Sequence, residues 1–196
     1  MRPPDPRTVR SRETALAAAR ELLIERGLAG LTHTAVAARS GISRATLYRL
    51  WPETPDLVCD TVTRHVDLTR PRPTGDLRDD LLAALTEVRA MLHEPAIEQG
   101  MRVVIERAAV DPKYAEVKES LYRSGTSAVR AVLTDAIARG ALPRDVDVDS
   151  AIDCLHGPLF FRRLLAGRRF ELDYVRIVVE RFLQADHTKS THQQGD

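Results

Sequence analysis

The chain has 196 residues, of which 43% are hydrophobic but only 5% aromatic, and its formal net charge is +1. This length suffices for one large or two small domains with a hydrophobic core. Few aromatic residues and no run of alternating β-branched residues argue against a β-sheet protein and predict an all-α fold. No apolar run approaches the ~20 residues of a membrane span, and the first eleven residues lack the apolar segment of a secretory signal. We therefore expect a cytoplasmic protein with no membrane contact.

The charges are unevenly distributed along the chain. Residues 1–51 carry nine Arg and four acidic residues, a net charge of +5, whereas residues 52–196 have a net charge of −4. A basic first segment on a nearly neutral protein favours local contact with a polyanion. Ordinary solvated surface charges are the alternative.

The N-terminal segment begins with a Pro-rich basic arm, residues 1–7, and continues with a helix expected from about Thr8 to Arg26. The apolar residues of this helix recur at helical spacing and form one stripe, made of Ala15, Ala18, Ala19, Leu22 and Leu23. Gly27 is expected to end the helix.

Residues 32–51 predict two short helices joined by a tight turn. Thr32 is a suitable N-cap for the first helix, because its hydroxyl can accept from a free backbone N–H of the first turn. Gly41 can adopt the positive φ that stops a helix, and Ser43 can cap the second helix, residues 44–50. This layout is typical of a helix-turn-helix, whose second helix enters the DNA major groove.

The second helix has two different faces. Leu47 and Leu50 are three residues apart and share the inward face, whereas Arg44, Ala45, Tyr48 and Arg49 point outward. Arginines suit phosphates and base edges, and a small Ala allows close approach to DNA. A plain corner between two helices, without a role in DNA binding, is the alternative interpretation.

The rest of the chain predicts six more helices, which brings the total to about nine. They are expected at residues 55–69, 76–93, 96–110, 112–139, 148–166 and 172–185. Thr54 is the expected N-cap of the first, and residues 69–75 form the clearest linker. The dipeptide Ser124-Gly125 is a candidate kink or break. The polar tail, residues 187–196, is expected to be disordered.

The segment His156-Gly157-Pro158 is unusual within the helix expected at 148–166. Pro158 removes the backbone hydrogen bond to the carbonyl of Cys154 and should bend this helix. Gly157 would let another helix approach closely. The alternative is a kinked core helix of a monomer.

The helix-turn-helix segment resembles the DNA-binding domain of the TetR/AcrR family of bacterial transcriptional regulators. The resemblance rests on Thr32, Val36-Ala37, Gly41-Ile42-Ser43, Thr46-Leu47-Tyr48 and Trp51. Two positions depart from the family's commoner pattern: Trp51 replaces Phe, and Thr54 replaces a Lys that touches phosphate.

This resemblance implies a DNA-binding domain at 8–54, bridged by 55–69 to a regulatory and dimerisation domain at 76–186. The implied partners are double-stranded DNA, a second copy of the chain and a small-molecule effector. The expected DNA contacts are Thr32, Thr34, Arg44, Ala45, Thr46, Tyr48, Arg49 and Trp51. The expected dimer interface includes Leu155, Gly157, Pro158, Phe161, Arg162, Val178 and Phe182. The candidates for an effector pocket are His65, Met91, Met101, Val104 and Tyr122, with plain core packing as the alternative for each.

Catalytic and metal chemistry have little support. Cys59 and Cys154 lack metal-ligand spacing and fit reduced thiols. No phosphate-binding Gly loop or nucleophile elbow is present. Asp147, Asp149 and Asp153 fit the cap and first turn of a helix better than a metal site. We therefore expect no enzyme activity, no cofactor and no metal.

The sequence predicts a homodimeric repressor that binds a palindromic operator and is released by a small molecule. Two alternatives remain open. One is a DNA-binding regulator or architectural factor without an effector. The other is a helical small-molecule-binding enzyme or carrier whose basic face serves another purpose.

Overall fold

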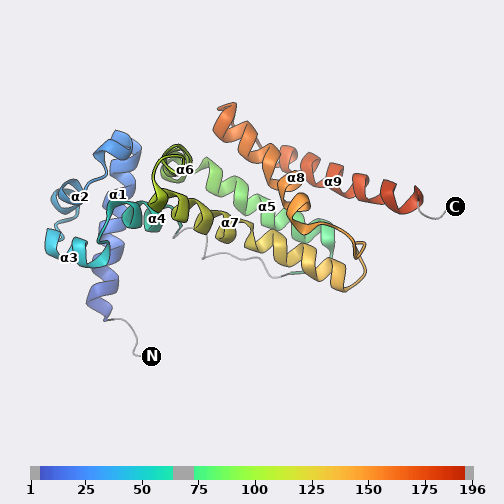
Figure 1. The fold of residues 1–196 in the computed structure, drawn as a ribbon, viewed down its shortest axis with the longest axis horizontal. Helices are drawn as coiled ribbons and strands as arrows, with labels where there is room; N and C mark the ends of the chain where they lie inside the picture. The colour runs from blue at the N-terminus through green and yellow to red at the C-terminus, as the bar shows by residue number, and fades with distance from the viewer. Residues whose placement is uncertain (1–4, 64–72, 193–196) are drawn as a thin grey trace. The chain divides into compact units, whose positions relative to one another are not determined.

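A computed structural model describes residues 5–63 and 73–192 of the chain, and within these ranges every regular element is helical (Figure 1). The predicted all-α class is therefore confirmed. The described α-helices are α1 (Pro6–Gly30), α2 (His33–Ser40), α3 (Arg44–Leu50), α4 (Thr54–Thr63), α5 (Leu77–His93), α6 (Pro95–Arg107), α7 (Pro112–Ala138), α8 (Val148–Phe160) and α9 (Leu172–His192). A π-helical turn, Phe161–Leu165, follows α8. No helix in the described ranges is long and apolar enough to cross a membrane.

The chain divides into two compact units, residues 1–65 with 94–122 and residues 66–93 with 123–196. This division differs from the expected boundary near residues 55–75, because α6 packs against α1 and α4. Gly100 lies at this crossing. A Cβ atom added there would come within 2.3 Å of the Cγ2 atom of Val62, so the absence of a side chain allows α6 to approach α4. Such long-range packing has no signature in local sequence.

In the first unit, α1 carries the apolar stripe expected from the sequence. Its buried residues are Ala15, Leu16, Ala18, Ala19, Leu22 and Leu23. The helix begins at Pro6 rather than Thr8, because the carboxylate of Asp5 accepts from the backbone N–H of Arg7 at 2.9 Å. At Gly27 the φ angle is 63°, which interrupts the helical path as predicted before a last short turn to Gly30.

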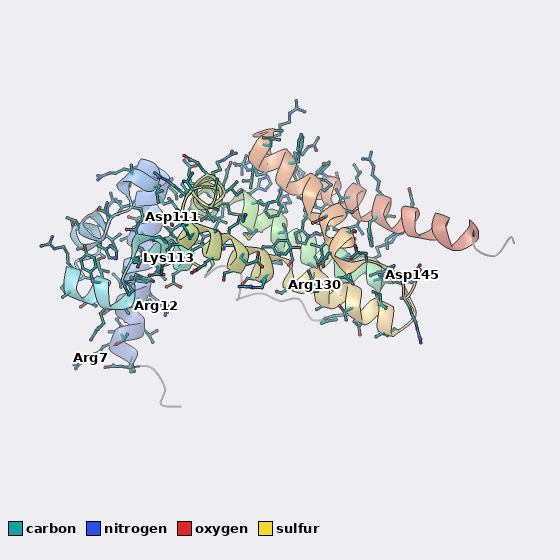
Figure 2. The ribbon with its side chains drawn as sticks, in the orientation of Figure 1. Arg7, Arg12, Asp111, Lys113, Arg130 and Asp145 are labelled. Carbon is teal, nitrogen blue, oxygen red and sulfur yellow. The ribbon has the colours of Figure 1, made fainter. Side chains whose placement is uncertain are left out.

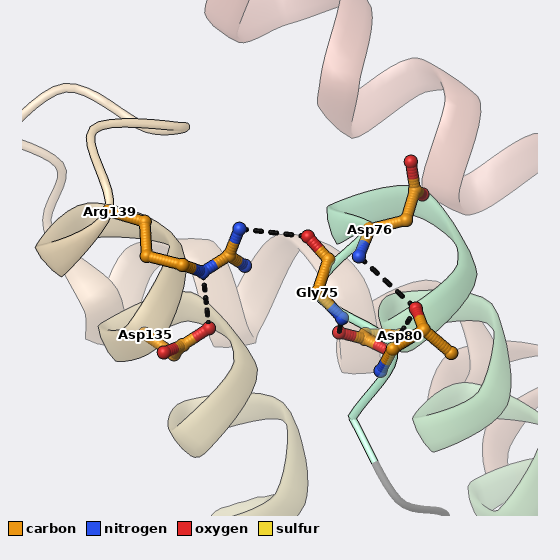
Figure 3. Close-up of polar contacts among 6 residues, drawn as sticks. Gly75, Asp76, Asp80, Asp135 and Arg139 are labelled. Atoms are coloured by element: carbon orange, nitrogen blue, oxygen red, sulfur yellow. Dashed lines mark hydrogen bonds and ion pairs between the residues drawn. The ribbon is translucent and has the colours of Figure 1, made fainter.

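In the second unit, α5 packs against α8 and α9, and the chain entering α5 is held from two sides (Figure 3). The carboxylate of Asp80 accepts from the backbone N–H of Thr74 at 2.7 Å and from that of Gly75 at 3.1 Å. Arg139 donates to the carbonyl of Gly75 at 2.8 Å. Burial acts to raise the pKa of Asp80, but these hydrogen bonds outweigh it and lower the pKa below its ordinary value of 3.8.

The helix expected at residues 148–166 changes from an α-helical to a π-helical hydrogen-bond pattern after Pro158. Pro158 has no N–H to donate to Cys154, and α8 ends two residues later. Further on, the N–H of Ala166 donates to the carbonyl of Phe161 at 2.9 Å, five residues back, which is the π-helical pattern. The expected disturbance is therefore present, in the form of a π-helical turn.

Several element ends differ from the prediction. Helix α4 starts one residue early, at Thr54, and α7 continues unbroken through Ser124-Gly125. Helix α6 ends at Arg107 rather than near residue 110. Helix α9 reaches His192, so residues 187–192, which were expected to be disordered, are helical. Most of the predicted linker, residues 69–72, lies outside the described residues.

Candidate nucleic-acid interface

The helix-turn-helix is built from three local caps, all of which the sequence predicted. The hydroxyl of Thr32 accepts from the N–H of Ala35 at 3.1 Å and begins α2. Gly41 ends α2 with a φ of 72°. The hydroxyl of Ser43 accepts from the N–H of Thr46 at 3.2 Å and begins α3. These hydrogen bonds satisfy backbone donors that a helix start leaves unpaired.

Helix α3 presents the two faces expected of a recognition helix. Leu47 is fully buried and anchors its inward side. The exposed residues on the other side are Arg44, Ala45, Tyr48 and Arg49. Neither arginine forms an ion pair with a carboxylate among the described residues, so both guanidinium groups have hydrogen-bond donors to offer.

Tyr48 is held in place by a residue that the sequence analysis missed. Its ring stacks on that of His33, with ring centroids 4.3 Å apart and planes 13° apart. His33 is 5% exposed, and its Nε2 atom lies 2.7 Å from the carbonyl oxygen of Trp51. Because a carbonyl only accepts, Nε2 carries the proton and donates. No local pattern links residues 33 and 48, which are distant in sequence.

Trp51 requires a correction. It was expected to touch DNA, but its side chain is 2% exposed and belongs to the core. The indole Nε1–H donates to a carboxylate oxygen of Asp60 at 2.9 Å. Since neither the ring nor its only donor faces outward, we remove the Trp51 side chain from the candidate contacts.

Thr32, Thr34 and Thr46 stay candidates. Thr32 and Thr34 are exposed at the start of α2, where free N–H groups and the helix dipole favour an anion. The Thr32 hydroxyl accepts from the backbone and keeps its own proton, so capping and donation to a phosphate are compatible. Thr46 is half-buried, with its hydroxyl 3.0 Å from that of Ser43.

Two other arginines of the basic segment already have carboxylate partners. Arg39, in α2, donates to Glu25 at 2.7 Å and to Glu21 at 3.0 Å. The hydrogen bonds from Arg39 lower the pKa of Glu25 below its ordinary value. Arg12 lies on α1, like Arg7 (Figure 2), and pairs with Asp60 at 2.6 Å. Arg44 and Arg49 on α3 have no such carboxylate partner among the described residues.

The candidate pocket residues fall in different places. His65 lies outside the described residues, and Met91 is half-buried in α5 of the second unit. The other three belong to the first unit. Of these, Val104 is 1% exposed, Met101 is half-buried one turn before it, and Tyr122 is 42% exposed. No group of three metal-ligating side chains gathers within the described part of the chain.

Two residues of the expected dimer interface also require correction. Leu155 is fully buried and Val178 is 6% exposed, so both face the chain's own core. Gly157 and Phe161 are exposed, the latter by 62%. The half-buried members of the expected set are Pro158, Arg162 and Phe182. The expected set omitted three exposed apolar residues of this region, Leu165 at 76%, Leu172 at 40% and Ile177 at 45%.

Comparison with known proteins gives consistent matches. Residues 15–58 match the family model of bacterial regulatory proteins of the tetR family, and residues 71–182 match that of tetracyclin repressor-like C-terminal domains. An uncharacterized HTH-type transcriptional regulator of Mycobacterium tuberculosis (strain ATCC 25618 / H37Rv) is 31% identical over 203 residues, which cover 97% of this chain and 95% of that protein. Another, from Bacillus subtilis (strain 168), is 27% identical over 191 residues, or 95% of each chain.

Solved structures show the same architecture. The crystal structure of the TetR family transcription regulator SCO0332 is 29% identical, with a TM-score of 0.70 over 89% of this chain and 97% of that chain. A TetR transcription regulator from Haloarcula marismortui is 20% identical and shares the fold, with a TM-score of 0.73 over 91% of this chain and 98% of that chain. These relatives are transcriptional regulators rather than enzymes. The chain belongs to the tetR family of bacterial regulatory proteins and is a helix-turn-helix transcriptional regulator.

Proposed function

We propose that this regulator is a homodimeric repressor in the cytoplasm, which binds a palindromic operator through α3 and is released by a small-molecule effector. The observation that carries the proposal is the outward face of α3. There Arg44 and Arg49 are exposed and unpaired among the described residues, beside a Tyr48 ring fixed by stacking. A fixed ring and available guanidinium groups are suited to a rigid polyanion with hydrogen-bonding base edges.

Each residue of this face has a role in the proposal, as do two threonines near the starts of α2 and α3. Arg44 and Arg49 contact bases or phosphates, and Tyr48 contacts phosphate. Thr34 and Thr46 donate to phosphate oxygens from the starts of their helices. The small side chain of Ala45 lets the backbone of α3 enter the groove closely.

The dimer follows from the size of the recognition helix. Helix α3 has seven residues and reaches only a few base pairs, which is too little to select one site in a genome. Two copies double the number of bases read and explain a palindromic operator. We assign the interface to the exposed side of α8 and its π-helical extension, where Gly157, Phe161 and Leu165 lie uncovered in the single chain.

The effector acts through linkage. The ligand binds more tightly to a dimer whose recognition helices are wrongly spaced for the operator, and it therefore lowers the affinity of the dimer for DNA. DNA lowers the affinity of the dimer for the ligand by the same factor. The residues proposed to meet an effector are Met101, Val104 and Tyr122 in the first unit and, separately, Met91 in the second. The methionines are adaptable side chains that suit such a contact.

The proposal is tested by binding of the purified protein to DNA that flanks its own gene. Fluorescence anisotropy at physiological salt should show saturable binding, and a shuffled duplex of equal length is the control. A panel of small molecules is then added, and an effector should both lower the DNA affinity and raise the melting temperature of the free protein. Absence of binding to flanking DNA and to any selected duplex would contradict the proposal. Binding without any ligand effect would favour a regulator that has no effector.

A further inference from the structure

Asp60 lies where three elements of the DNA-binding unit meet. Its side chain is 15% exposed, and a single oxygen, Oδ2, accepts two hydrogen bonds and forms an ion pair. Arg12 of α1 donates from Nε at 2.8 Å, and its terminal nitrogen Nη2 forms the ion pair at 2.6 Å. The indole Nε1 of Trp51 donates at 2.9 Å. Asp60 itself belongs to α4, so its carboxylate connects α4 to α1 and to the end of α3.

The contacts continue from Trp51 to the outward face of α3. The backbone N–H of Trp51 closes α3 by donating to the carbonyl of Leu47 at 2.8 Å. The carbonyl of Trp51 accepts from His33, and the His33 ring stacks on Tyr48. An unbroken set of hydrogen bonds and one ring stack therefore joins the Asp60 carboxylate to a proposed DNA contact.

We propose that Asp60 is a positioning residue for DNA recognition, which fixes Trp51 and thereby sets the orientation of Tyr48 on α3. The carboxylate holds the indole N–H and the Arg12 guanidinium by charge-assisted hydrogen bonds, and a neutral acceptor holds both more weakly, so the ring is then free to turn. Turning the ring shifts the Trp51 backbone, and with it the His33 hydrogen bond and the Tyr48 stack. The inference rests on the proposed function in one respect, namely that α3 contacts the DNA.

The direction in which DNA affinity changes when Asp60 is substituted distinguishes a positioning role from a purely electrostatic one. Asp60→Asn keeps the shape of the side chain but removes a negative charge from the DNA-binding unit and releases Arg12. Charge alone would therefore strengthen binding to a polyanion. A positioning role requires the opposite, because a displaced Tyr48 loses its phosphate contact.

The matched control is Asp56→Asn, one turn earlier on α4. Asp56 accepts from the backbone N–H of Glu53 at 3.2 Å, and its substitution removes the same charge from the same helix. The probe is a duplex that the wild-type protein has selected from a random library. Asp60→Asn should weaken binding about tenfold, which corresponds to about 1.4 kcal/mol. Asp56→Asn should bind as tightly as the wild type or more tightly.

Coupling to Tyr48 is measured with a double mutant. In a Tyr48→Ala background, Asp60→Asn should cost little further affinity, because the group that it positions is gone. A general weakening of the fold would instead add to the Tyr48→Ala loss. Trp51 is the only tryptophan of the chain, so its emission maximum is a direct signature, and it should shift in Asp60→Asn but not in Asp56→Asn.

Trp51→Phe provides a second route if Asp60→Asn does not fold, since it removes the N–H donor and part of the ring while keeping an aromatic side chain in the core. It should reproduce the loss of DNA affinity at wild-type helical content. Wild-type affinity or tighter binding in Asp60→Asn, or an additive loss in the double mutant, would overturn the inference. A wild-type protein that selects no duplex at all would instead contradict the proposed function.

Discussion

At the scale of single residues, Tyr48 and Arg49 carry the most direct prediction. Tyr48→Ala should weaken operator binding for all sequences, because a phosphate contact carries no base information. If Arg49 reads a base, Arg49→Ala should cost about 1–3 kcal/mol and relax specificity at one position of the operator. Titration against a panel of duplexes with single base changes measures both effects.

Arg39→Ala is the matched control for Arg49→Ala. It removes the same charge from the helix-turn-helix, but the Arg39 guanidinium is already paired with Glu21 and Glu25. Its loss should leave base specificity unchanged. Unaltered affinity in both Tyr48→Ala and Arg49→Ala would show that α3 does not face the DNA.

His156 should make stability depend on pH. It is 7% exposed, and burial lowers its pKa below the ordinary value of 6.5. Its Nδ1 atom lies 3.2 Å from the carbonyl of Ile152, which partly opposes this effect. With a folded pKa below the unfolded one, the unfolded chain binds more protons as the solution becomes acidic. Stability should therefore be complete above pH 6.5 and fall as the pH drops through the lowered value.

Thermal unfolding followed over this pH range measures the effect. His156→Gln, which does not titrate, should flatten the acid limb. Some dependence of stability on pH should remain in this variant, because burial also lowers the pKa of His93. An acid limb that is identical in the variant and the wild type would show that His156 carries none of the effect.

The contrast between predicted and missed residues has a physical cause. Thr32, Gly41 and Ser43 act on backbone within a few positions of themselves, so their capping roles could be predicted from local sequence. The roles of Trp51 and His33 depend on partners 9 and 18 residues away. Local sequence alone does not distinguish an exposed aromatic residue at a helix end from a buried one, because the difference depends on those distant partners.

At the scale of elements, α8 shows which features of a helix local sequence predicts and which it does not. The sequence predicted its start, where Asp147 accepts from the N–H of Asp149 at 3.1 Å, and a disturbance at Pro158. It did not predict the π-helical turn, which depends on which carbonyls the later N–H groups reach. The assignment of Leu155 to the interface was wrong, because a helix that is apolar on more than one side does not reveal which side faces its own core.

The exposed side of α8 carries the next prediction. A Cβ atom added at Gly157 would meet nothing within 4 Å in its own chain, so Gly157→Glu should leave the isolated fold intact. In the proposed dimer it would bury an unpaired charge against the second copy, which is strongly unfavourable. The variant should therefore sediment as a monomer and lose operator affinity.

Gly125→Glu in α7 is the matched control, since an added Cβ atom there also meets nothing within 4 Å. It should sediment like the wild type. A dimeric Gly157→Glu protein with normal DNA affinity would place the interface elsewhere.

At the scale of the whole molecule, the linker predicted from the sequence and the compact packing units of the structure divide the chain at different places. Pro and Gly signals near residues 69–75 mark a linker in sequence. Packing nevertheless places residues 94–122 with the N-terminal unit, because α6 meets α1 and α4 near Gly100. Contacts between segments so far apart in sequence are set by the complementary shapes of the helices rather than by local pattern.

The last prediction concerns the charge distribution of the whole chain. Residues 1–51 have a net charge of +5 and the remainder −4, so attraction to DNA is concentrated in the DNA-binding segment. Each phosphate neutralised by an arginine releases condensed counterions, and the logarithm of the binding constant should fall with the logarithm of salt concentration by about 0.9 per contact. In a dimer both copies contribute, so the slope should be twice that of a single DNA-binding segment.

The Gly157→Glu variant tests this factor of two. As a monomer it should show about half the wild-type slope, as well as weaker binding at every salt concentration, because half of the phosphate contacts are lost. Arg49→Ala in the dimer should lower the slope only slightly, by one contact in each copy. A wild-type slope near zero would rule out direct phosphate contact, whereas equal slopes in a monomeric Gly157→Glu protein and the dimeric wild type would mean that the second copy does not touch the DNA.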